Sequence, residues 1–381
     1  MDKETLKVYL LKTIRWLAIQ TIKKYQPSII AVTGSVGKTS TKEAIYVVLK
    51  DHRKTRANKG NFNSDLGLPL TILGDWKADD FFLFSRENPV GEKQWEKAQF
   101  LFKVISIGLL RLIFGFRKNY PEILVLEYAA DKPGDLKYLL DIAKPQIGVI
   151  TAIGEIPVHI ESYSSPEAVA REKVKVIEAL PAVGFAVLNY DDETVLDLQD
   201  RTRAHLFTYG FDSNAGMKIT NFENLMDNER PIGIIFKLNY AGSFLPVKLE
   251  GVFGKAQAYA AAAAACIGII YGSNLVKISK ALSQYKAPIG RGQLINGVKG
   301  SYIIDDSYNA SPLSMLAAVD TINSIKAKRK IAVLGDMLEI GKYTEGAHKN
   351  VGKAAAKVFD ILFTVGERAK FIAEAAKEAG M

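Results

Sequence analysis

The sequence contains almost no cysteine, and its other absences are equally informative. Cys266 is the one cysteine among 381 residues, which excludes a disulfide framework or a zinc site built from cysteines and fits a reducing compartment. The apolar residues near the start are interrupted by Lys7, Lys12 and Arg15, with no small-residue cleavage site after them, so we expect no secretory signal peptide. No uncharged apolar run reaches about 18 residues, so we expect no membrane-spanning helix. These absences predict a cytoplasmic protein.

The composition is that of an ordinary folded protein. Hydrophobic residues make up 48% and charged residues 24% of the chain, which excludes a disordered or fibrous protein and predicts two or three domains. The chain carries 50 Lys and Arg against 41 Asp and Glu, a net charge of +9. This excess favours an anionic partner: a nucleotide, a nucleic acid or a membrane surface. Because the sequence shows no basic-aromatic stripe and no known reading module, we expect no nucleic-acid partner.

Short apolar runs alternate with helical segments along most of the chain. This alternation predicts an α/β fold with a mostly parallel sheet. The segment 218–249 is instead polar and alternating, which indicates an antiparallel patch. We predict strands at 29–32, 123–127, 147–151, 185–189, 302–305, 331–334 and 361–365, and helices at 4–25, 38–50, 166–180, 256–270 and 312–324.

A glycine turn at residues 33–40 (TGSVGKTS) joins the first strand to its helix. Such a turn points backbone N–H groups at phosphate oxygens, and the helix start adds positive potential. Lys38 would reach the β- and γ-phosphates, and the Thr39 hydroxyl would hold Mg²⁺. The first glycine is closer to the second than in the usual pattern. We predict ATP as the ligand of this loop, with contacts from Gly34, Ser35, Val36, Gly37, Lys38, Thr39 and Ser40.

The shortened loop and a series of later segments resemble the Mur ligases, the ATP-dependent amide-forming enzymes of peptidoglycan precursor synthesis, and the related folylpolyglutamate synthetases. The last two of these segments resemble the branch that adds D-alanyl-D-alanine to a UDP-muramoyl tripeptide. The resemblance covers roughly residues 28–381. The matching segments are 33–41 (TGSVGKTST), 58–63 (NKGNFN), 67–71 (GLPLT), Glu127 at a strand end, 150–154 before His159, 170–173 (AREK), 290–291 (GR), 305–312 (DDSYNASP) and 334–341 (LGDMLEIG).

The pattern and the resemblance together predict three parts. Residues 1–27 are an amphipathic helix, 28–292 a central ATPase domain with a mostly parallel sheet, and 293–381 a Rossmann-like α/β ligase domain. The central domain carries a basic apolar insertion at about 76–120. The branch that this chain resembles has a UDP-binding domain before the phosphate loop, so we expect that domain to be lacking and the last domain to be short or incomplete.

The resemblance implies a metal and catalytic set of Lys38, Thr39, Glu127, His159 and Lys173. Thr39 and Glu127 offer hard oxygen ligands for Mg²⁺, and His159 matches a ligand of a second magnesium ion. Lys173 matches a lysine that many Mur ligases carry as a carbamate, an anion able to stabilise magnesium. Two alternatives stay open from the residues themselves: a structural role for His159, and a solvated charged helix face for Lys173.

Further residues match those that grip ATP and read the incoming amine. Arg291 and Asp306 match the residues that hold ATP from the domain junction and the last domain. Asn309 and Ser311 fall where the amine substrate is read. The segment that contacts adenine in the family departs from its usual histidine and asparagines; Gln257 is the residue there that we expect to replace one amide.

Two segments, 4–25 and 98–118, are both basic and apolar. The second carries Lys103, Arg111, Arg117 and Lys118 and no acidic residue. They could form a surface that rests on anionic lipid at the inner face of the membrane. The alternative is that both are helices packed on the core or on each other.

Three functions remain open from the sequence. The first is an ATP-dependent ligase that activates a carboxylate as an acyl phosphate and joins it to an amino acid or dipeptide, in peptidoglycan precursor or related envelope synthesis. The second is the same chemistry on a carboxylate without UDP, for example a lipid-linked one. For this reason we expect weak or no binding of UDP-muramoyl tripeptide. The third is a nucleotide-binding scaffold without ligase activity.

Overall fold

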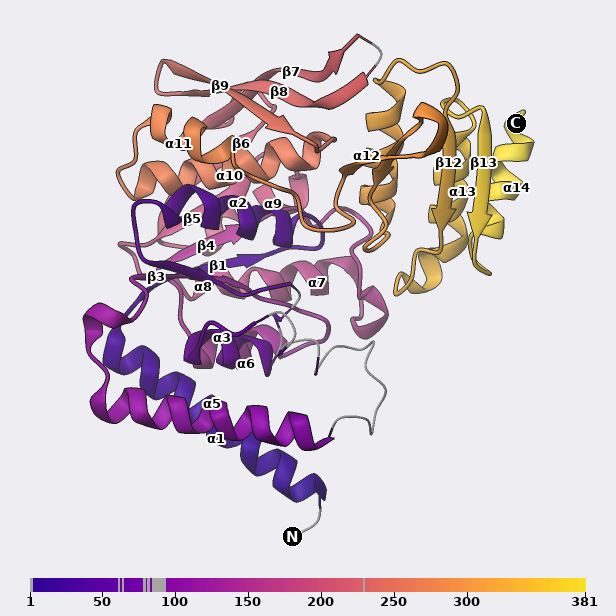
Figure 1. Cartoon of the computed structure of the whole chain (residues 1–381). Coiled ribbons are helices and arrows are strands. Elements are labelled where there is room, and N and C mark those ends of the chain that lie inside the picture. Colours follow the sequence, from indigo (N-terminus) through magenta and orange to yellow (C-terminus); the bar gives the residue numbers. More distant parts are fainter. Residues whose placement is uncertain are drawn as a thin grey trace.

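A computed structural model describes residues 3–60, 62–63, 65–77, 80, 83, 94–228 and 230–381, with the backbone alone for 3–7 and 94. Asn61 of the segment 58–63 and a large part of the predicted insertion at 76–120 lie outside the described residues. A long sheet with helices on both sides forms the body of the molecule, and a second α/β region lies at one end (Figure 1).

The main sheet has nine strands in the order β2-β3-β1-β4-β5-β6-β7-β8-β9. Neighbours from β2 to β7 run parallel, and β7, β8 and β9 are antiparallel. This confirms the predicted mostly parallel sheet and the antiparallel patch. The strands are β1 (Ser28–Thr33), β2 (Thr55–Ala57), β3 (Ile123–Glu127), β4 (Ile147–Ile150), β5 (Phe185–Asn189), β6 (His205–Gly210), β7 (Met217–Asp227), β8 (Arg230–Tyr240) and β9 (Ser243–Glu250).

Burial explains why the two kinds of strand differ in sequence. Every residue of β3 and β4 is buried, as expected for parallel strands covered on both faces. In β9, exposed and buried residues alternate after its first two positions, so one face of the antiparallel patch meets solvent. An uninterrupted apolar run therefore marks the centre of the sheet, and alternation marks its edge.

Two hydrophobic clusters cover the opposite faces of the sheet. Ile30 and Val32 of β1 face a cluster formed with α2 (Lys38–Lys50), α10 (Lys255–Ile270) and α11 (Leu275–Leu282). The alternate residues Ile29 and Ala31 face α1, α3, α5 and α6. These helices span Lys3–Tyr25, Gly67–Leu73, Gln94–Phe114 and Asp135–Ile142.

The helix α10 contains six consecutive alanines, Ala260 to Ala265, all buried. It packs against α2 and against β5, β6 and β7. Because alanine side chains are small, α10 can lie close to α2 and to the sheet. The helix α2, which begins at the phosphate loop, is therefore packed tightly into the hydrophobic core.

The predicted helix 166–180 is divided into α7 (Pro166–Lys173) and α8 (Lys175–Glu178). Ser165 caps the start of α7 by accepting a hydrogen bond from the Ala168 N–H. Val174 keeps helical dihedral angles between the two parts, so the chain direction changes little. A further short helix, α9 (Glu193–Leu196), follows β5.

The second α/β region contains two small sheets. Strands β10 (Gln293–Asn296) and β11 (Tyr302–Asp305) are antiparallel, and β12 (Ile331–Gly335) and β13 (Ile361–Val365) are parallel. The helices are α12 (Pro312–Asn323), α13 (Thr344–Ala355) and α14 (Lys370–Glu378). Val252, next to β9, forms a bridge with Gln293 of β10, so the start of this region is attached to the main sheet. Among the described helices, none is long and apolar enough to cross a membrane.

Candidate active site

The phosphate loop lies between the end of β1 and the start of α2. Gly34 has φ +147°, and a Cβ there would lie 2.0 Å from Thr151 Oγ1. Gly37 has φ +87° and precedes the first residue of α2. Both positions therefore need glycine, the first because of close packing and the second because of its left-handed backbone.

The first turn of α2 offers free backbone donors. The N–H groups of Ser35 and Val36 donate to the carbonyl oxygen of Ala152, at 2.6 and 3.1 Å, and so tie the loop to the end of β4. No side chain caps α2, which leaves the N–H groups of its first residues available at the positive end of the helix. The Ser35 hydroxyl oxygen is also buried, and no described residue hydrogen-bonds to it. This is the arrangement that an anionic phosphate group requires.

Lys38 lies folded over the same loop. Its Nζ donates to the carbonyl oxygens of Gly34 and Ser35, at 3.0 and 3.4 Å. Burial lowers the pKa of Lys38, and the nearby Glu127 carboxylate opposes that shift. The ammonium group is thus held beside the free helix N–H groups, close to an acidic side chain.

Glu127 stands at the end of β3, beside Val32 of β1. Its Oε1 accepts a hydrogen bond from Asn63 Nδ2 at 2.8 Å. Its Oε2 is buried and has no partner among the described residues. A buried carboxylate oxygen without a donor is costly unless a cation meets it. Glu127 therefore fits a magnesium ligand, as its sequence position predicts.

The segment 58–63 is attached both to the Glu127 backbone and to α2. Asn58 Oδ1 accepts a hydrogen bond from the Glu127 N–H at 2.8 Å. Lys42 of α2 is fully buried, and its Nζ donates to the carbonyl oxygens of Asn58 and Gly60. Sequence reasoning noted this segment as a motif but missed the role of Lys42 in holding it.

His159 is placed between two carboxylates from different parts of the chain. Its Nε2 lies 3.4 Å from Asp131 Oδ1, and its Nδ1 contacts Glu339 Oε2 in the second α/β region. Within the described ranges, no three His, Cys, Asp or Glu side chains cluster closely enough to form a metal cage. Mg²⁺ needs no such cage, since one or two carboxylates, phosphate oxygens and water complete its shell. Glu127 and the buried Thr39 fit that pattern, and His159 as a ligand stays a prediction.

Lys173 is buried, which rules out a solvated helix face for this residue. Burial, together with the nearby Lys38 ammonium group, lowers its pKa to about 7. The adjacent Glu172 is engaged elsewhere, accepting hydrogen bonds from the N–H groups of Gly134 and Leu136. Asp131 acts electrostatically on both lysines and is a site residue that sequence reasoning missed, although it follows Glu127 by four positions.

The junction with the second α/β region is built on Gln257 and Arg291. Gln257 Nε2 donates to the Arg291 carbonyl oxygen at 2.7 Å, and its Oε1 accepts from the Tyr285 hydroxyl at 2.8 Å. The Arg291 guanidinium lies 4.2 Å from the centre of the Tyr308 ring. Burial raises the pKa of Asp306, and Arg291 opposes that shift. Both amide atoms of Gln257 are thus engaged within the protein.

A cavity of about 310 Å³ joins the phosphate loop to this junction. Its lining includes Val36 and Gly37 of the loop, together with Gln257, Asp306 and Asn309. Ser311 does not line it; its hydroxyl caps α12 and exchanges hydrogen bonds with Ser314. The fold therefore gathers the predicted loop, Arg291, Asp306 and Asn309 around one cavity, while Ser311 has a structural contact.

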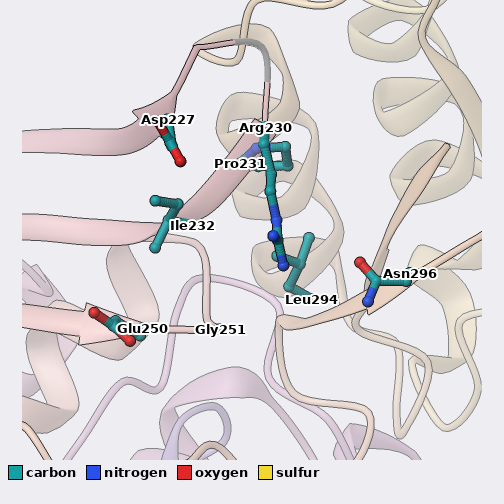
Figure 2. Close-up of a pocket in the computed structure, with 8 residues that line it drawn as sticks. All are labelled: Asp227, Arg230, Pro231, Ile232, Glu250, Gly251, Leu294 and Asn296. Carbon is teal, nitrogen blue, oxygen red and sulfur yellow. The ribbon is translucent and has the colours of Figure 1, made fainter. Parts of the chain in front are cut away.

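A second pocket, of about 510 Å³, lies away from these residues. It is formed where β8, β9 and β10 meet, and Figure 2 shows the Arg230 side chain extending toward Leu294 across it. Asp227, Arg230, Glu250 and Asn296 at its rim are exposed. None of the predicted site residues lines this pocket.

Comparison with known protein families identifies the family to which this chain belongs. Residues 32–86 and 90–268 match the Mur ligase middle domain, and residues 290–381 match the Mur ligase glutamate ligase domain. This chain belongs to the Mur ligase family. The predicted family is thereby confirmed.

Two curated relatives of this chain share one name. The UDP-N-acetylmuramoyl-tripeptide–D-alanyl-D-alanine ligase of Bacillus subtilis (strain 168) is 31% identical over 368 residues, which is 96% of this chain and 68% of that protein. The enzyme of the same name from Mycobacterium leprae (strain TN) is 28% identical, over 87% of this chain and 59% of that protein. The chain thus spans about three-fifths to two-thirds of the length of these relatives.

Solved structures agree with the fold. MurF ligase from Thermotoga maritima, in complex with ADP, is similar with a TM-score of 0.75 and 25% identity, over 95% of this chain and 72% of that one. MurF from Acinetobacter baumannii has the same TM-score at 24% identity, over 96% and 69%. The predicted α/β class is confirmed.

Proposed function

We propose that this Mur ligase family member catalyses ATP-dependent amide bond formation. In this reaction a substrate carboxylate takes the γ-phosphoryl group of ATP to form an acyl phosphate. An amine then attacks the acyl carbon, and phosphate leaves. The observation that carries the proposal is the buried Glu127 Oε2, which has no partner among the described residues, in a carboxylate that acts electrostatically on Lys38 at the uncapped start of α2. A cation and a triphosphate are the ligands that this pair of features fits together.

Each residue near the phosphate loop has a role in this reaction. The N–H groups at the start of α2 and the Lys38 ammonium group stabilise the charge on the phosphate oxygens. Thr39 and Glu127 would hold Mg²⁺, which neutralises phosphate charge when bound. Asn63 keeps Glu127 oriented through the hydrogen bond to Oε1. Arg291 and Asp306 hold the nucleotide from the junction, where they line or adjoin the cavity.

We also propose that Lys173 is carbamylated. A neutral amine is the form that adds to CO₂, giving a carbamate anion and releasing one proton. A lysine with its pKa lowered to about 7 is about half neutral at pH 7, unlike an exposed lysine. The resulting carbamate anion would lie near Lys38. The Lys38 ammonium group repels Lys173 while Lys173 is a cation, and it would attract the carbamate.

The substrates are proposed from the named relatives. By name, those relatives join a UDP-N-acetylmuramoyl tripeptide to D-alanyl-D-alanine. The amine that we propose for this chain is therefore a dipeptide. Asn309 on the cavity wall would contact it. The carboxylate is a peptidoglycan precursor or a related envelope precursor. We place the reaction in the cytoplasm, with the ligase domain at 293–381 after the ATPase domain at 28–292. Contact with an anionic membrane is a separate proposal, because it concerns a different surface.

The test measures ADP release by a coupled assay. We expect ADP release with ATP and Mg²⁺ to require both D-alanyl-D-alanine and a carboxylate acceptor. UDP-muramoyl tripeptide and a lipid-linked muramoyl peptide would be compared as acceptors, and mass spectrometry would identify the amide product. The Lys38→Ala variant is the matched control. ATP binding without ADP release under any combination of acceptor and amine would favour a scaffold and contradict the proposal.

A further inference from the structure

The helix α5 presents an apolar face to solvent. Trp95, Phe102 and Ile113 are 74%, 72% and 66% exposed. Together with Leu109 they recur at seven- and four-residue intervals, so they form one stripe along the helix. The opposite side of α5 is also apolar and packs inward through Phe100 and Val104. α5 thus has apolar residues on two opposite sides, and its exposed apolar stripe marks an interaction surface.

The neighbouring helix α1 extends this surface. Lys24 of α1 donates to the carbonyl oxygens of Arg111 and Leu112 of α5, at 3.0 and 2.7 Å, which fixes the two helices side by side. Both lie on the outer side of α3, at the lower edge of the molecule in Figure 1. Trp16 of α1 is 52% exposed. We call this surface the helical face; its exposed side chains are Val8, Tyr9, Lys12, Trp16 and Lys23 of α1, and Trp95, Phe102, Lys103, Leu109, Leu110, Ile113, Phe114, Phe116, Arg117 and Lys118 of α5 and the turn after it.

The charge of this surface is mainly positive. Residues 3–27 and 94–121 contain eleven basic residues and two acidic ones, Glu4 and Glu96. The exposed cations Lys12, Lys23, Lys103, Arg117 and Lys118 form no ion pair with any residue that the structure describes. The helical face therefore combines exposed aromatic side chains with uncompensated positive charge.

We propose that the helical face docks on an anionic lipid bilayer, with α1 and α5 lying in the plane of the membrane interface. Aromatic and aliphatic side chains on this face would enter the headgroup boundary while lysines and arginines contact lipid phosphates. Trp and Phe side chains flanked by cations are typical of protein segments that lie at the membrane–water interface. A second copy of the chain is a poor occupant, because its identical face would bring five further exposed cations against these five.

The proposal requires docking without a spanning segment. None of the described helices could cross a bilayer, and neither of the two pockets described above lies at the helical face. The docking is independent of the proposed ligase reaction, since the phosphate loop residues take no part in it.

Vesicle co-sedimentation tests the proposal on the full chain. Vesicles of phosphatidylglycerol and phosphatidylcholine would be compared with vesicles of phosphatidylcholine alone. We expect binding to the anionic vesicles, weakened at least about tenfold in 0.5 M salt, because surface ion pairing is screened there. The double variant Phe102→Ser/Ile113→Ser should bind at least about tenfold more weakly. The double variant Lys12→Gln/Lys103→Gln should lose a comparable factor, since each cation near such a surface contributes about 1 kcal/mol.

A matched control is Phe244→Ser, which changes an equally exposed aromatic side chain, 64% exposed, on β9. It should bind vesicles like the unchanged protein, and thermal unfolding should show that all variants fold. Absence of binding to anionic vesicles would overturn the proposal, as would equal binding to both vesicle types. A dimer in lipid-free solution that is lost in Phe102→Ser/Ile113→Ser would overturn it too, by showing that the face joins two copies.

Discussion

Replacing Lys173 with methionine should stabilise the protein while lowering its activity. The side chain is buried, and its pKa falls from 10.5 to about 7 on folding. Between these two pH values the unfolded chain holds a proton that the folded chain has released, so the free energy of unfolding rises with pH across this window. Below about pH 7 the full penalty of the buried amine is present. Lys173→Met removes the penalty and keeps a side chain of similar length.

The size of the effect follows from the pKa change. Each pKa unit corresponds to about 1.4 kcal/mol, so the penalty amounts to about 4 to 5 kcal/mol at neutral pH and disappears above about pH 10.5. We expect Lys173→Met to be more stable than the unchanged protein at pH 6.5 by several kcal/mol. That difference should shrink steadily toward pH 10. Titrating groups that do not interact with Lys173 cancel, because both proteins carry them; Lys38, Asp131 and Glu172 interact with it and contribute smaller differences.

Urea unfolding followed by circular dichroism measures this difference at each pH, in buffer free of CO₂. Arg171→Met is the matched control, since Arg171 lies on the exposed side of the same helix and such surface changes alter stability by about 0.5 kcal/mol or less. ADP release should fall strongly in Lys173→Met and little in Arg171→Met. A Lys173→Met protein that is less stable at pH 6.5, or a difference that does not vary with pH, would refute the reasoning.

Three further predictions concern the residues around the phosphate loop. Lys38→Ala should abolish ADP formation and leave the circular dichroism spectrum unchanged; normal turnover would remove Lys38 from the site. Asn63→Ala should raise the Mg²⁺ concentration for half-maximal ADP release, because Glu127 loses the donor at its Oε1, whereas an unchanged Mg²⁺ dependence would contradict this. Lys42→Met leaves the carbonyl oxygens of Asn58 and Gly60 without their donor. It should cost about 1 to 3 kcal/mol in urea unfolding, and an unchanged midpoint would show that the segment needs no such support.

The sequence predicted the sheet well because its signal is local. Apolar runs such as 123–127 and 147–150 coincide with buried central strands. The predicted sheet omitted β2 and β6, which have three and six residues. β2 is not fully buried, and β6 is exposed over its first two residues. Short strands with partial exposure carry too few apolar residues to stand out from the surrounding loops.

The site was predicted less completely because its contacts join distant segments. Lys173 follows Arg171 and precedes Lys175, and in the sequence this looks like one charged face. On a helix, however, a residue two positions away points to a different side, and the structure buries Lys173 while Arg171 is exposed. The contact of Asn63 with Glu127 spans 64 positions, and the contact of His159 with Glu339 spans 180. No local pattern encodes such pairs.

The alanine face of α10 makes the central domain mechanically stiff between its two ends. Helices α2 and α10 pack together, and alanine has no side-chain rotamers that could absorb a small displacement. One end of this pair is the phosphate loop; the other is Lys255, whose Nζ pairs with Asp320 of α12 at 3.0 Å, and Gln257, which holds the Arg291 backbone. Tight α2–α10 packing leaves little room for α2 to move without α10, which carries the contacts to the junction. The loop half and the junction half of the cavity are thus joined by one tightly packed helix pair, and only the last contacts, from Lys255 and Gln257, use side chains.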